Sequence, residues 1–435
     1  MYKRKILTSG AICILLGYVN TSYADQTQRL GDVSNPKQQF KIAMEQLENQ
    51  NLSTTDFRKG FKWLRLSAAL QYPEAQYTLG FYHQLGIDGT EQDYYKAVAL
   101  YESAAGEGHL AAQFQLSSLL LNQGLPTYDP ERGLYWLTRA AQQNDTVSQY
   151  SLAVLYRDKQ PETQENLSQY LEWLTRSAEN GYRKAQYTLG SYYIEDNEQT
   201  FDLNKAFHWF HEAAEQGDAD SQYNLALIYE QQGAGLAHQE QAVYWFSQAS
   251  EQGMPGAMFN LGRRYLLGRG IEQNINEGLA LVRAAAKSGN PAAQTMLGSY
   301  HIQGQLLEKN YEKAMQLYKT AAKHAYPEAQ YQLALMFARG QGVQKSEKQA
   351  VHWISKAAEL NHPMAQYGLG AYLINGVGVE QDMFLAAYWI SLAAAQGQEH
   401  AVKARDSVLQ NLNAQELKSL NSKLKHGSSV TMPVK

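Results

Sequence analysis

The chain has 435 residues, of which 38 are Lys or Arg and 42 are Asp or Glu, so its formal net charge is −4 at pH 7. A modestly acidic chain without a basic stripe is a poor match for nucleic acid or anionic lipid, because both are bound through clustered positive charge. The single cysteine, Cys13, excludes a disulfide framework and any site that needs several thiolates.

The first 24 residues have the pattern of a secretory signal peptide. Residues 3–5 supply the basic start, residues 6–19 the apolar middle, and residues 22–24 a small-x-small motif that predicts cleavage after Ala24. The apolar run is short for a membrane span, and an uncleaved N-terminal anchor is the alternative interpretation. Ile12 precedes Cys13 where a bacterial lipoprotein site needs a small residue, which argues against lipidation.

Cleavage would also change the chemistry that the chain can offer. It removes three basic residues and no acidic ones, so Lys and Arg fall from 38 to 35 against 42 acidic residues, a net charge of about −7. It removes Cys13 as well, which excludes a thiol-dependent enzyme and leaves burial alone to hold the exported fold. We expect no integral membrane span in the mature form. Residues 25–36 are predicted to be a flexible mature N-terminus.

One sequence signature then recurs along the chain. It is Ala or Ser, usually Gln, usually Tyr or Phe, and then Leu two residues later, and successive copies begin 36 or 37 residues apart. A fixed period in this range is typical of stacked repeat arrays, so we predict an elongated all-α solenoid of antiparallel helix pairs with a 36-residue period. The nine copies begin at Ala75, Ala112, Ser148, Ala185, Ser221, Ala257, Ala293, Ala329 and Ala365.

Residues 329–362 illustrate one unit. They read as an apolar helix, a glycine-bearing turn and a second helix built on Ala350, Trp353 and Ala357 at helical spacing. Gly or Asn stands four residues before most signatures, where a helix can end in the left-handed conformation, and Pro often follows two residues later, where the next helix begins. The recurrent Gln of the signature either bonds neighbouring backbone groups or is simply solvated.

These signals divide the chain into segments. Residues 37–72 match the pattern weakly and are predicted to be a degenerate N-terminal capping repeat, and residues 73–398 hold nine full repeats. Residues 399–426 read as two amphipathic capping helices at the C-terminal end, and residues 427–435 as a disordered tail. The turn between the paired helices is glycine-rich in repeats six, eight and nine and differs in the others, so it can vary without disturbing the stack.

The repeat resembles the Sel-1-like repeat family, a relative of the tetratricopeptide repeats, over roughly residues 37–398. The resemblance implies a right-handed α-solenoid (superhelix) that acts as an interaction scaffold. Exported bacterial members resemble proteins that organise envelope assemblies or contact host proteins, although a shared fold does not fix the function. The motifs that carry the resemblance in repeat six are Leu261-Gly262, Tyr265, the Gly268/Gly270 turn and Ala284-Ala285, with Gly278 and Leu281 in place of the usual Ala and Trp.

The candidate partner-binding residues are the aromatic rings at the third position of the signature. By analogy with tetratricopeptide grooves, this position of the first helix lines the concave face, where a ladder of rings could grip an extended peptide or a sugar. The competing interpretation, that the rings wedge between repeats as core, is favoured by their regularity. Specificity is expected four residues later, where Arg263 stands in repeat six. The rings are Tyr77, Phe114, Tyr150, Tyr187, Tyr223, Phe259, Tyr331 and Tyr367.

The sequence indicates no catalytic group, bound cofactor or metal site. His211 and Glu215 have the i,i+4 spacing of a metal-ligand pair, but no third ligand lies near them in sequence, and His208 occupies a position that varies between repeats. No pair of carboxylates is singled out for acid–base chemistry, and no phosphate-binding loop follows a strand. We therefore predict that the protein is not an enzyme; an enzyme with a dispersed site is the alternative.

Together these patterns predict an exported scaffold that binds protein partners through a concave groove, in the periplasm of a Gram-negative bacterium and in cell-envelope assembly or secretion. Binding of the cell-wall glycan and secretion as a factor that contacts host proteins are the two alternatives. Nucleic acid and cofactors are not expected.

Overall fold

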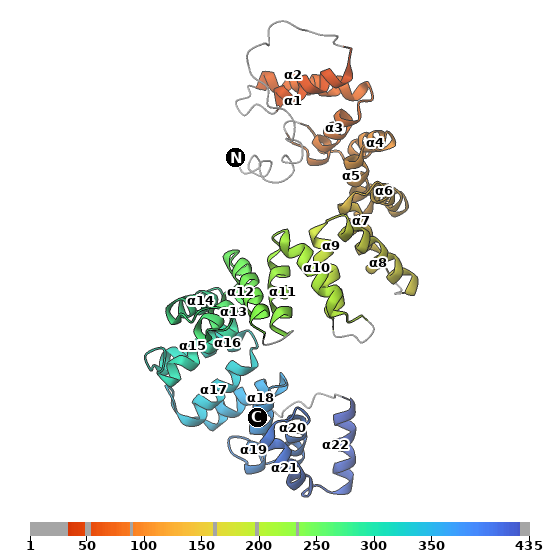
Figure 1. The fold of residues 1–435 in the computed structure, drawn as a ribbon. Coiled ribbons are helices and arrows are strands. Elements are labelled where there is room, and N and C mark those ends of the chain that lie inside the picture. The colour runs from red at the N-terminus through yellow and green to blue at the C-terminus, as the bar shows by residue number, and fades with distance from the viewer. Residues whose placement is uncertain are drawn as a thin grey trace. The chain divides into compact units, whose positions relative to one another are not determined.

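The computed structural model describes residues 34–47, 54–87, 90–159, 163–195, 200–231 and 235–426. Within these ranges the chain forms 22 α-helices and no β-strand, which confirms the predicted all-α fold (Figure 1). The predicted signal peptide at residues 1–24, the segment 25–33 and the predicted tail at residues 427–435 lie outside the described residues.

The helices come in pairs, and nine consecutive pairs begin 36 or 37 residues apart, which confirms the predicted period. They are numbered as repeats one to nine, from α3/α4 to α19/α20. The first helices are α1(Pro36–Leu47), α3(Pro73–Leu85), α5(Leu110–Leu121), α7(Thr146–Arg157), α9(Arg183–Ile194), α11(Ala219–Gln231), α13(Pro255–Leu267), α15(Pro291–Gln303), α17(Pro327–Arg339) and α19(Pro363–Asn375). The second helices are α2(Thr54–Ala69), α4(Tyr94–Gly106), α6(Pro130–Gln142), α8(Gln164–Glu179), α10(Leu203–Glu215), α12(Leu236–Glu251), α14(Ile275–Lys287), α16(Tyr311–Lys323), α18(Glu347–Glu359) and α20(Met383–Ala395), and α21(Glu399–Leu409) and α22(Ala414–His426) follow.

The chain divides into two compact units, Met1–Tyr182 with helices α1–α8 and Arg183–Lys435 with helices α9–α22. Within each unit a helix packs mainly against the helices that precede and follow it along the chain. In the second unit α9 also contacts α11, and α15 also contacts α17. First helices of neighbouring repeats therefore lie side by side at these places, and the solvent-exposed side of the first helices within each unit is called the first-helix face below.

The two helices of a pair approach closely because a small residue of the first helix faces a large residue of the second. A Cβ added to the glycine would lie 2.6–2.8 Å from the facing ring, so only glycine fits without a shift of the helices. The facing rings are at most 1% exposed and are among the largest fully buried side chains of the described chain. The pairs are Gly80 with Tyr101, Gly190 with Phe210, and Gly298 with Tyr318.

Side chains at the helix ends bind backbone groups that a helix leaves free. Most second helices begin after an Asp, Asn, Ser or Thr whose side chain accepts a backbone N–H of the first turn. The first helices α3, α13, α15, α17 and α19 carry a proline in their first turn, as predicted. The N-cap residues of the second helices are Asp93, Asp129, Thr163, Asp202, Asn274, Asn310, Ser346 and Asp382.

The predicted left-handed residues between repeats are also confirmed, because each has a positive φ. Two junctions use a residue that is neither Gly nor Asn: Gln71 has a φ of 61° and Ala325 a φ of 54°. A residue with a Cβ is strained in this region by about 1–2 kcal/mol. The residues that follow the prediction are Gly108, Asn144, Gly181, Gly217, Gly253, Gly289 and Asn361.

Ala325→Gly is therefore expected to stabilise the joint between repeats seven and eight by about 1 kcal/mol, because glycine adopts this φ without strain. The midpoint of urea unfolding and the amide exchange of α16 and α17 would measure the gain. As a control, Ala338→Gly inside α17 should destabilise the same repeat by about 0.5–1 kcal/mol. Equal destabilisation by both substitutions would show that Ala325 is not strained.

Candidate partner-binding surface

The eight predicted rings all lie on first helices at the same place in the helix, and each is half-buried. The Ala or Ser two residues before each ring and the Leu two residues after it are buried core residues. Each ring therefore stands at the boundary between the core and the first-helix face. Tyr77, Phe114 and Tyr150 belong to the first unit, and Tyr187, Tyr223, Phe259, Tyr331 and Tyr367 to the second.

Several rings reach residues at or near the beginning of the next first helix or, after repeat nine, of α21. The ring of Tyr150 lies 5.4 Å from that of Tyr182, and the ring of Tyr367 stacks on His400 at 5.8 Å. The hydroxyl of Tyr223 accepts a hydrogen bond from the amide of Asn260 at 3.3 Å. The rings thus contribute to packing at the joints, and part of each ring also remains accessible on the first-helix face.

At the joint between repeats eight and nine, the ring of Tyr331 packs against a hydrogen-bonded pair formed by His362 and Glu328. His362 caps α19 through its Nδ1, which accepts the backbone N–H of Ala365 at 3.1 Å, so Nε2 carries the proton of the neutral ring. Nε2 donates to the carboxylate of Glu328 at 2.9 Å, and this hydrogen bond lowers the pKa of Glu328. The imidazole also stacks on Tyr331 with the ring centres 4.9 Å apart.

The joint between repeats one and two has the same stacked ring and the same helix cap. His109 stacks on Tyr77 at 4.9 Å, and its Nδ1 accepts the backbone N–H of Ala112 at 3.1 Å. Burial lowers the pKa of His109, which favours the neutral imidazole that can cap the helix. We did not predict these two histidines, although both stand three residues before the signature and this shared register would have identified them.

Two adjacent arginines on α13 have different environments. Arg263 is half-buried, with its guanidinium 5.7 Å from the ring centre of Phe259 on the preceding turn. Arg264 is 5% exposed, forms an ion pair of 3.2 Å with Glu230, and lies 5.6 Å from the ring centre of Phe246. Burial lowers the pKa of Arg264, but a guanidinium remains charged at any physiological pH.

Arg264 connects repeat six to repeat five in a way that the sequence reasoning missed. Its Nη1 donates to the backbone carbonyl of Gln239 at 3.4 Å, and its partner Glu230 also belongs to repeat five. In the same repeat Met258 stands in place of the recurrent glutamine. Comparing the repeats would have revealed an arginine at a position that is otherwise apolar or aromatic. The corresponding residues are Tyr82, Leu119, Leu155, Tyr192, Ile228, Tyr300, Met336 and Tyr372.

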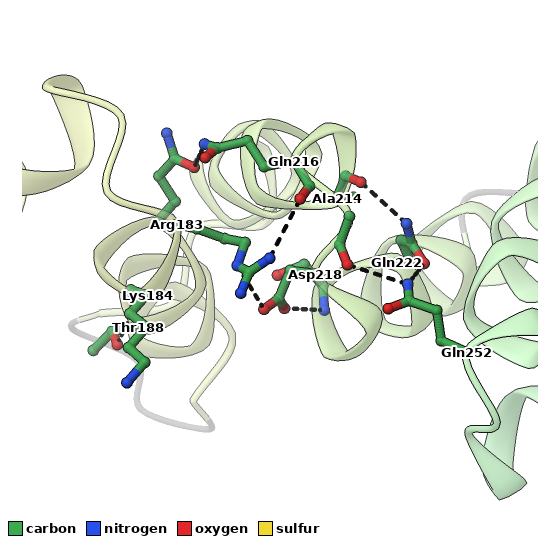
Figure 2. Close-up of polar contacts among 11 residues, drawn as sticks. Arg183, Lys184, Thr188, Ala214, Gln216, Asp218, Gln222 and Gln252 are labelled. Carbon is green, nitrogen blue, oxygen red and sulfur yellow. Dashed lines mark hydrogen bonds and ion pairs between the residues drawn. The ribbon is translucent and has the colours of Figure 1, made fainter. Parts of the chain in front are cut away.

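The recurrent glutamines are 0–4% exposed, so the interpretation that they are solvated is wrong. Figure 2 shows the arrangement at repeat five. The amide of Gln222 donates to the backbone carbonyl of Ala214 on α10 at 3.1 Å, and its oxygen accepts from the amide of Gln252, just after α12, at 2.8 Å. Each such glutamine connects the second helix of the preceding repeat with both helices of its own. Gln113 and Gln366 make the same two bonds.

Three glutamines lack the second bond, because Oε1 of Gln76, Gln294 and Gln330 is buried without a partner. The residue after the second helix explains the difference. It is Glu107, His324 or Leu360 in these repeats, whereas a glutamine or asparagine donates from this place in the other repeats that carry the recurrent glutamine. A buried acceptor without a partner costs about 1–3 kcal/mol. The donors elsewhere are Gln143, Asn180, Gln216, Gln252 and Gln396.

We expect Leu360→Gln to stabilise repeat eight by about 1 kcal/mol, because the new amide can donate to Oε1 of Gln330. Leu360 is 42% exposed, so little apolar burial is lost. Urea unfolding and amide exchange in α17 and α18 would measure the gain. Leu360→Glu is the matched control, since glutamate has the same length and no donor. If the two variants were equally stable, the predicted bond would not form.

The described residues hold no group of three His, Cys, Asp or Glu placed to bind a metal ion. Nε2 of His211 lies 3.8 Å from the carboxylate of Glu215 at the surface of α10, and that pair stands without a third ligand in the described chain. No helix in the described ranges is long and apolar enough to cross a membrane.

The fold and the first-helix face define a class of protein, the α-solenoids built from stacked helix pairs. Within this class, the model of the Sel1 repeat matches almost the whole array, so the chain belongs to the Sel1 repeat family. Proteins of this family generally mediate protein–protein interactions and are typically non-enzymatic. The ten matched segments are residues 39–72, 73–109, 110–145, 146–182, 183–218, 219–254, 255–290, 291–326, 327–362 and 363–398.

Two solved structures are similar to this chain over most of their length. A protective antigen of uropathogenic Escherichia coli with the same fold is 25% identical, with a TM-score of 0.52 over 92% of this chain and 96% of that one. A Sel1 repeat protein from Oxalobacter formigenes is 27% identical, with a TM-score of 0.57 over 71% and 89%. An uncharacterised protein of Neisseria meningitidis serogroup B is 36% identical over 101 residues, which are 23% of this chain and 20% of that protein.

Proposed function

We propose that this protein is an exported, non-enzymatic scaffold that holds protein partners on its first-helix face, in the assembly or secretion machinery of a bacterial cell envelope. The row of half-buried rings carries the proposal, because eight of the nine repeats keep an aromatic residue partly exposed at the same place. Aromatic rings provide a large contact area at a low cost in side-chain entropy, and the rings within each unit are held in place by their own repeats, so they need little ordering on binding.

The position four residues after the ring supports the same proposal. It lies one turn further along the first helix, and its side chain changes from repeat to repeat in size, polarity and charge. A regular frame with variable side chains allows one array to recognise a particular partner. The residues at this position are Phe81, Ser118, Val154, Ser191, Leu227, Arg263, Ser299, Leu335 and Ala371.

Site-specific photo-crosslinking in the producing cell would test the binding surface. A photoreactive residue at Leu335 on α17 is expected to capture partner proteins, whereas the same residue at Lys356 on α18, exposed on the second helix of the same repeat, should capture several-fold less. Equal capture from both sites, or capture from the second helix alone, would contradict binding through the first-helix face. Retention on purified peptidoglycan without protein crosslinks would favour the glycan alternative.

The proposed export has a separate test. The pattern of residues 1–24 supports cleavage after Ala24, so mass spectrometry of the mature protein should find Asp25 at its N-terminus, in the periplasmic fraction. A protein that retains Met1 would contradict this part of the proposal.

The similarity to a protective antigen favours one second candidate, a factor exposed to the host. Such a protein would appear in the culture supernatant or at the cell surface rather than in the periplasm. Protease treatment of intact cells distinguishes the two, because only a surface-exposed protein is digested.

A further inference from the structure

Arg263 has an unusual environment among the arginines that the structure describes. The others are either exposed to solvent or, in the case of Arg264, paired with a carboxylate. Arg263 is half-buried and has no carboxylate partner in the described part of the chain. A cation that has lost part of its hydration without gaining an ion pair is poised to gain a favourable interaction with an incoming anion.

One ring packs against this guanidinium, and two tyrosines further along the chain lie within range of its charge. The ring centre of Phe259, in repeat six, lies 5.7 Å from the central carbon of the Arg263 guanidinium. Its positive charge also acts on the phenol groups of Tyr300 on α15 and Tyr326 at the start of α17, where it opposes the rise in pKa that burial causes. A phenol hydroxyl can donate a hydrogen bond, so an anion beside Arg263 would find further donors in these two tyrosines.

Two carboxylates also lie in this region, and each already has a partner on the chain: Glu230 pairs with Arg264, and Glu328, whose charge acts on Tyr326, is hydrogen-bonded to His362. Arg263 repels Arg264, and this repulsion helps to lower the pKa of Arg264. The carboxylate of Glu230 is already engaged with Arg264 at 3.2 Å and therefore does not neutralise Arg263. A negative group bound here would be attracted by Arg263, because the charge of Arg264 is already compensated by Glu230.

The row of rings is interrupted beside this charge. Repeat seven carries Thr295 in place of the ring, and its hydroxyl is turned inward to donate to the carbonyl of Pro291 at 2.7 Å. The row therefore passes from Phe259 to Tyr331 without a ring between them. A ligand that lies along the face therefore finds no accessible ring in repeat seven, next to the half-buried cation.

We propose that the first-helix face of repeats six to eight binds an extended protein segment through an acidic side chain, Asp or Glu, that pairs with Arg263. A carboxylate matches the planar fork of a guanidinium in two parallel hydrogen bonds, and Tyr300 and Tyr326 can donate to it from the next repeats. The flanking rings then hold apolar side chains of the same segment. The inference rests on the proposed function, because it names the chemistry that the same face recognises.

The test selects phage-displayed random dodecapeptides on the purified full-length chain, and in parallel on the variants Arg263→Gln and Arg283→Gln. Arg283 is the matched control, because it is an exposed arginine on α14, the second helix of the same repeat. Circular dichroism checks that each variant is folded. The most enriched peptide is then synthesised with a C-terminal amide, once with its acidic residue and once with Gln or Asn there, and its affinity is measured by fluorescence anisotropy.

We expect wild type and Arg283→Gln to enrich peptides with Asp or Glu beside an apolar residue, and Arg263→Gln to lose this preference. Removing the carboxylate should weaken binding to wild type about tenfold, as should Arg263→Gln, and combining the two changes should cause little further loss. Tyr300→Phe should weaken only the acidic peptide.

Three results would overturn the inference. Peptides that bind equally well to Arg263→Gln, or that show no acidic preference, would refute it and leave the proposed function standing. Arg263-dependent binding that survives replacement of the acidic residue by Gln or Asn would refute the choice of an acidic side chain. If no peptide were enriched on any variant, both the inference and binding of extended segments by this face would fail.

Discussion

Phe246→Ala is expected to destabilise repeat five by about 3–5 kcal/mol, because it removes a fully buried aromatic side chain and leaves a cavity. Phe246 is 0% exposed on α12, its ring lies 5.8 Å from that of Tyr223, and the guanidinium of Arg264 lies 5.6 Å from its centre. The substitution would therefore open the core of one helix pair and also remove the ring beside a buried charge.

The loss should be local, because α12 packs mainly against α11 and α13. Hydrogen exchange followed by mass spectrometry should show faster exchange in repeats five and six and near-normal protection in α19 to α22. Phe201→Ala is the control, since Phe201 is 54% exposed in the same unit and its removal should change stability by less than about 0.5 kcal/mol. Uniform loss of protection throughout the second unit would contradict nearest-neighbour coupling.

Gly342→Ala is expected to cost about 2–4 kcal/mol, the sum of backbone strain and a collision between repeats. Gly342 has a φ of 69°, and an added Cβ would lie 2.7 Å from Cβ of Tyr311 and 3.0 Å from its carbonyl carbon and oxygen. Tyr311 is the first residue of α16, so this glycine of repeat eight packs directly on the second helix of repeat seven.

Gly340→Ala provides the matched comparison, because Gly340 has nearly the same φ, 67°, and an added Cβ would find its nearest neighbour at 3.4 Å. This variant should cost only about 1–2 kcal/mol from the backbone. The difference between the two variants, measured by urea unfolding, isolates the contact between repeats. If both cost the same, the contact with Tyr311 would not restrict this position.

Much of the fold could be predicted from sequence because the same residue pattern occurs in every repeat. Small residues, leucines and helix-ending glycines recur at a fixed period, so a weak signal in one unit is reinforced by the others. The second helices show the limit of such reasoning. Trp353 was predicted as a core residue, yet it is half-buried and the adjacent Ile354 is 3% exposed. Two neighbouring apolar residues fit the helical spacing almost equally well, so periodicity alone could not decide between them.

Less of the candidate partner-binding surface could be predicted from the sequence. The positions of the rings were predictable, but their half-burial depends on how closely one repeat meets the next, which no single repeat encodes. The stacking of His109 and His362 on tyrosines, and the ion pair between Arg264 and Glu230, join residues about one repeat apart. Such pairs follow from the angle between neighbouring helix pairs, which depends on packing in three dimensions.

In repeat six Met258 replaces the recurrent glutamine, and Arg264 provides the link to the preceding repeat instead. This difference restricts which repeats can be exchanged between positions of the array. Most repeats carry an interchangeable amide link, so a protein engineer could transplant them between positions with little loss. Repeat six depends instead on the carboxylate of Glu230 in repeat five. A chimaera that moves residues 255–290 alone would strand a buried cation, whereas one that moves residues 219–290 as a single cassette would carry Glu230 along and preserve the joint.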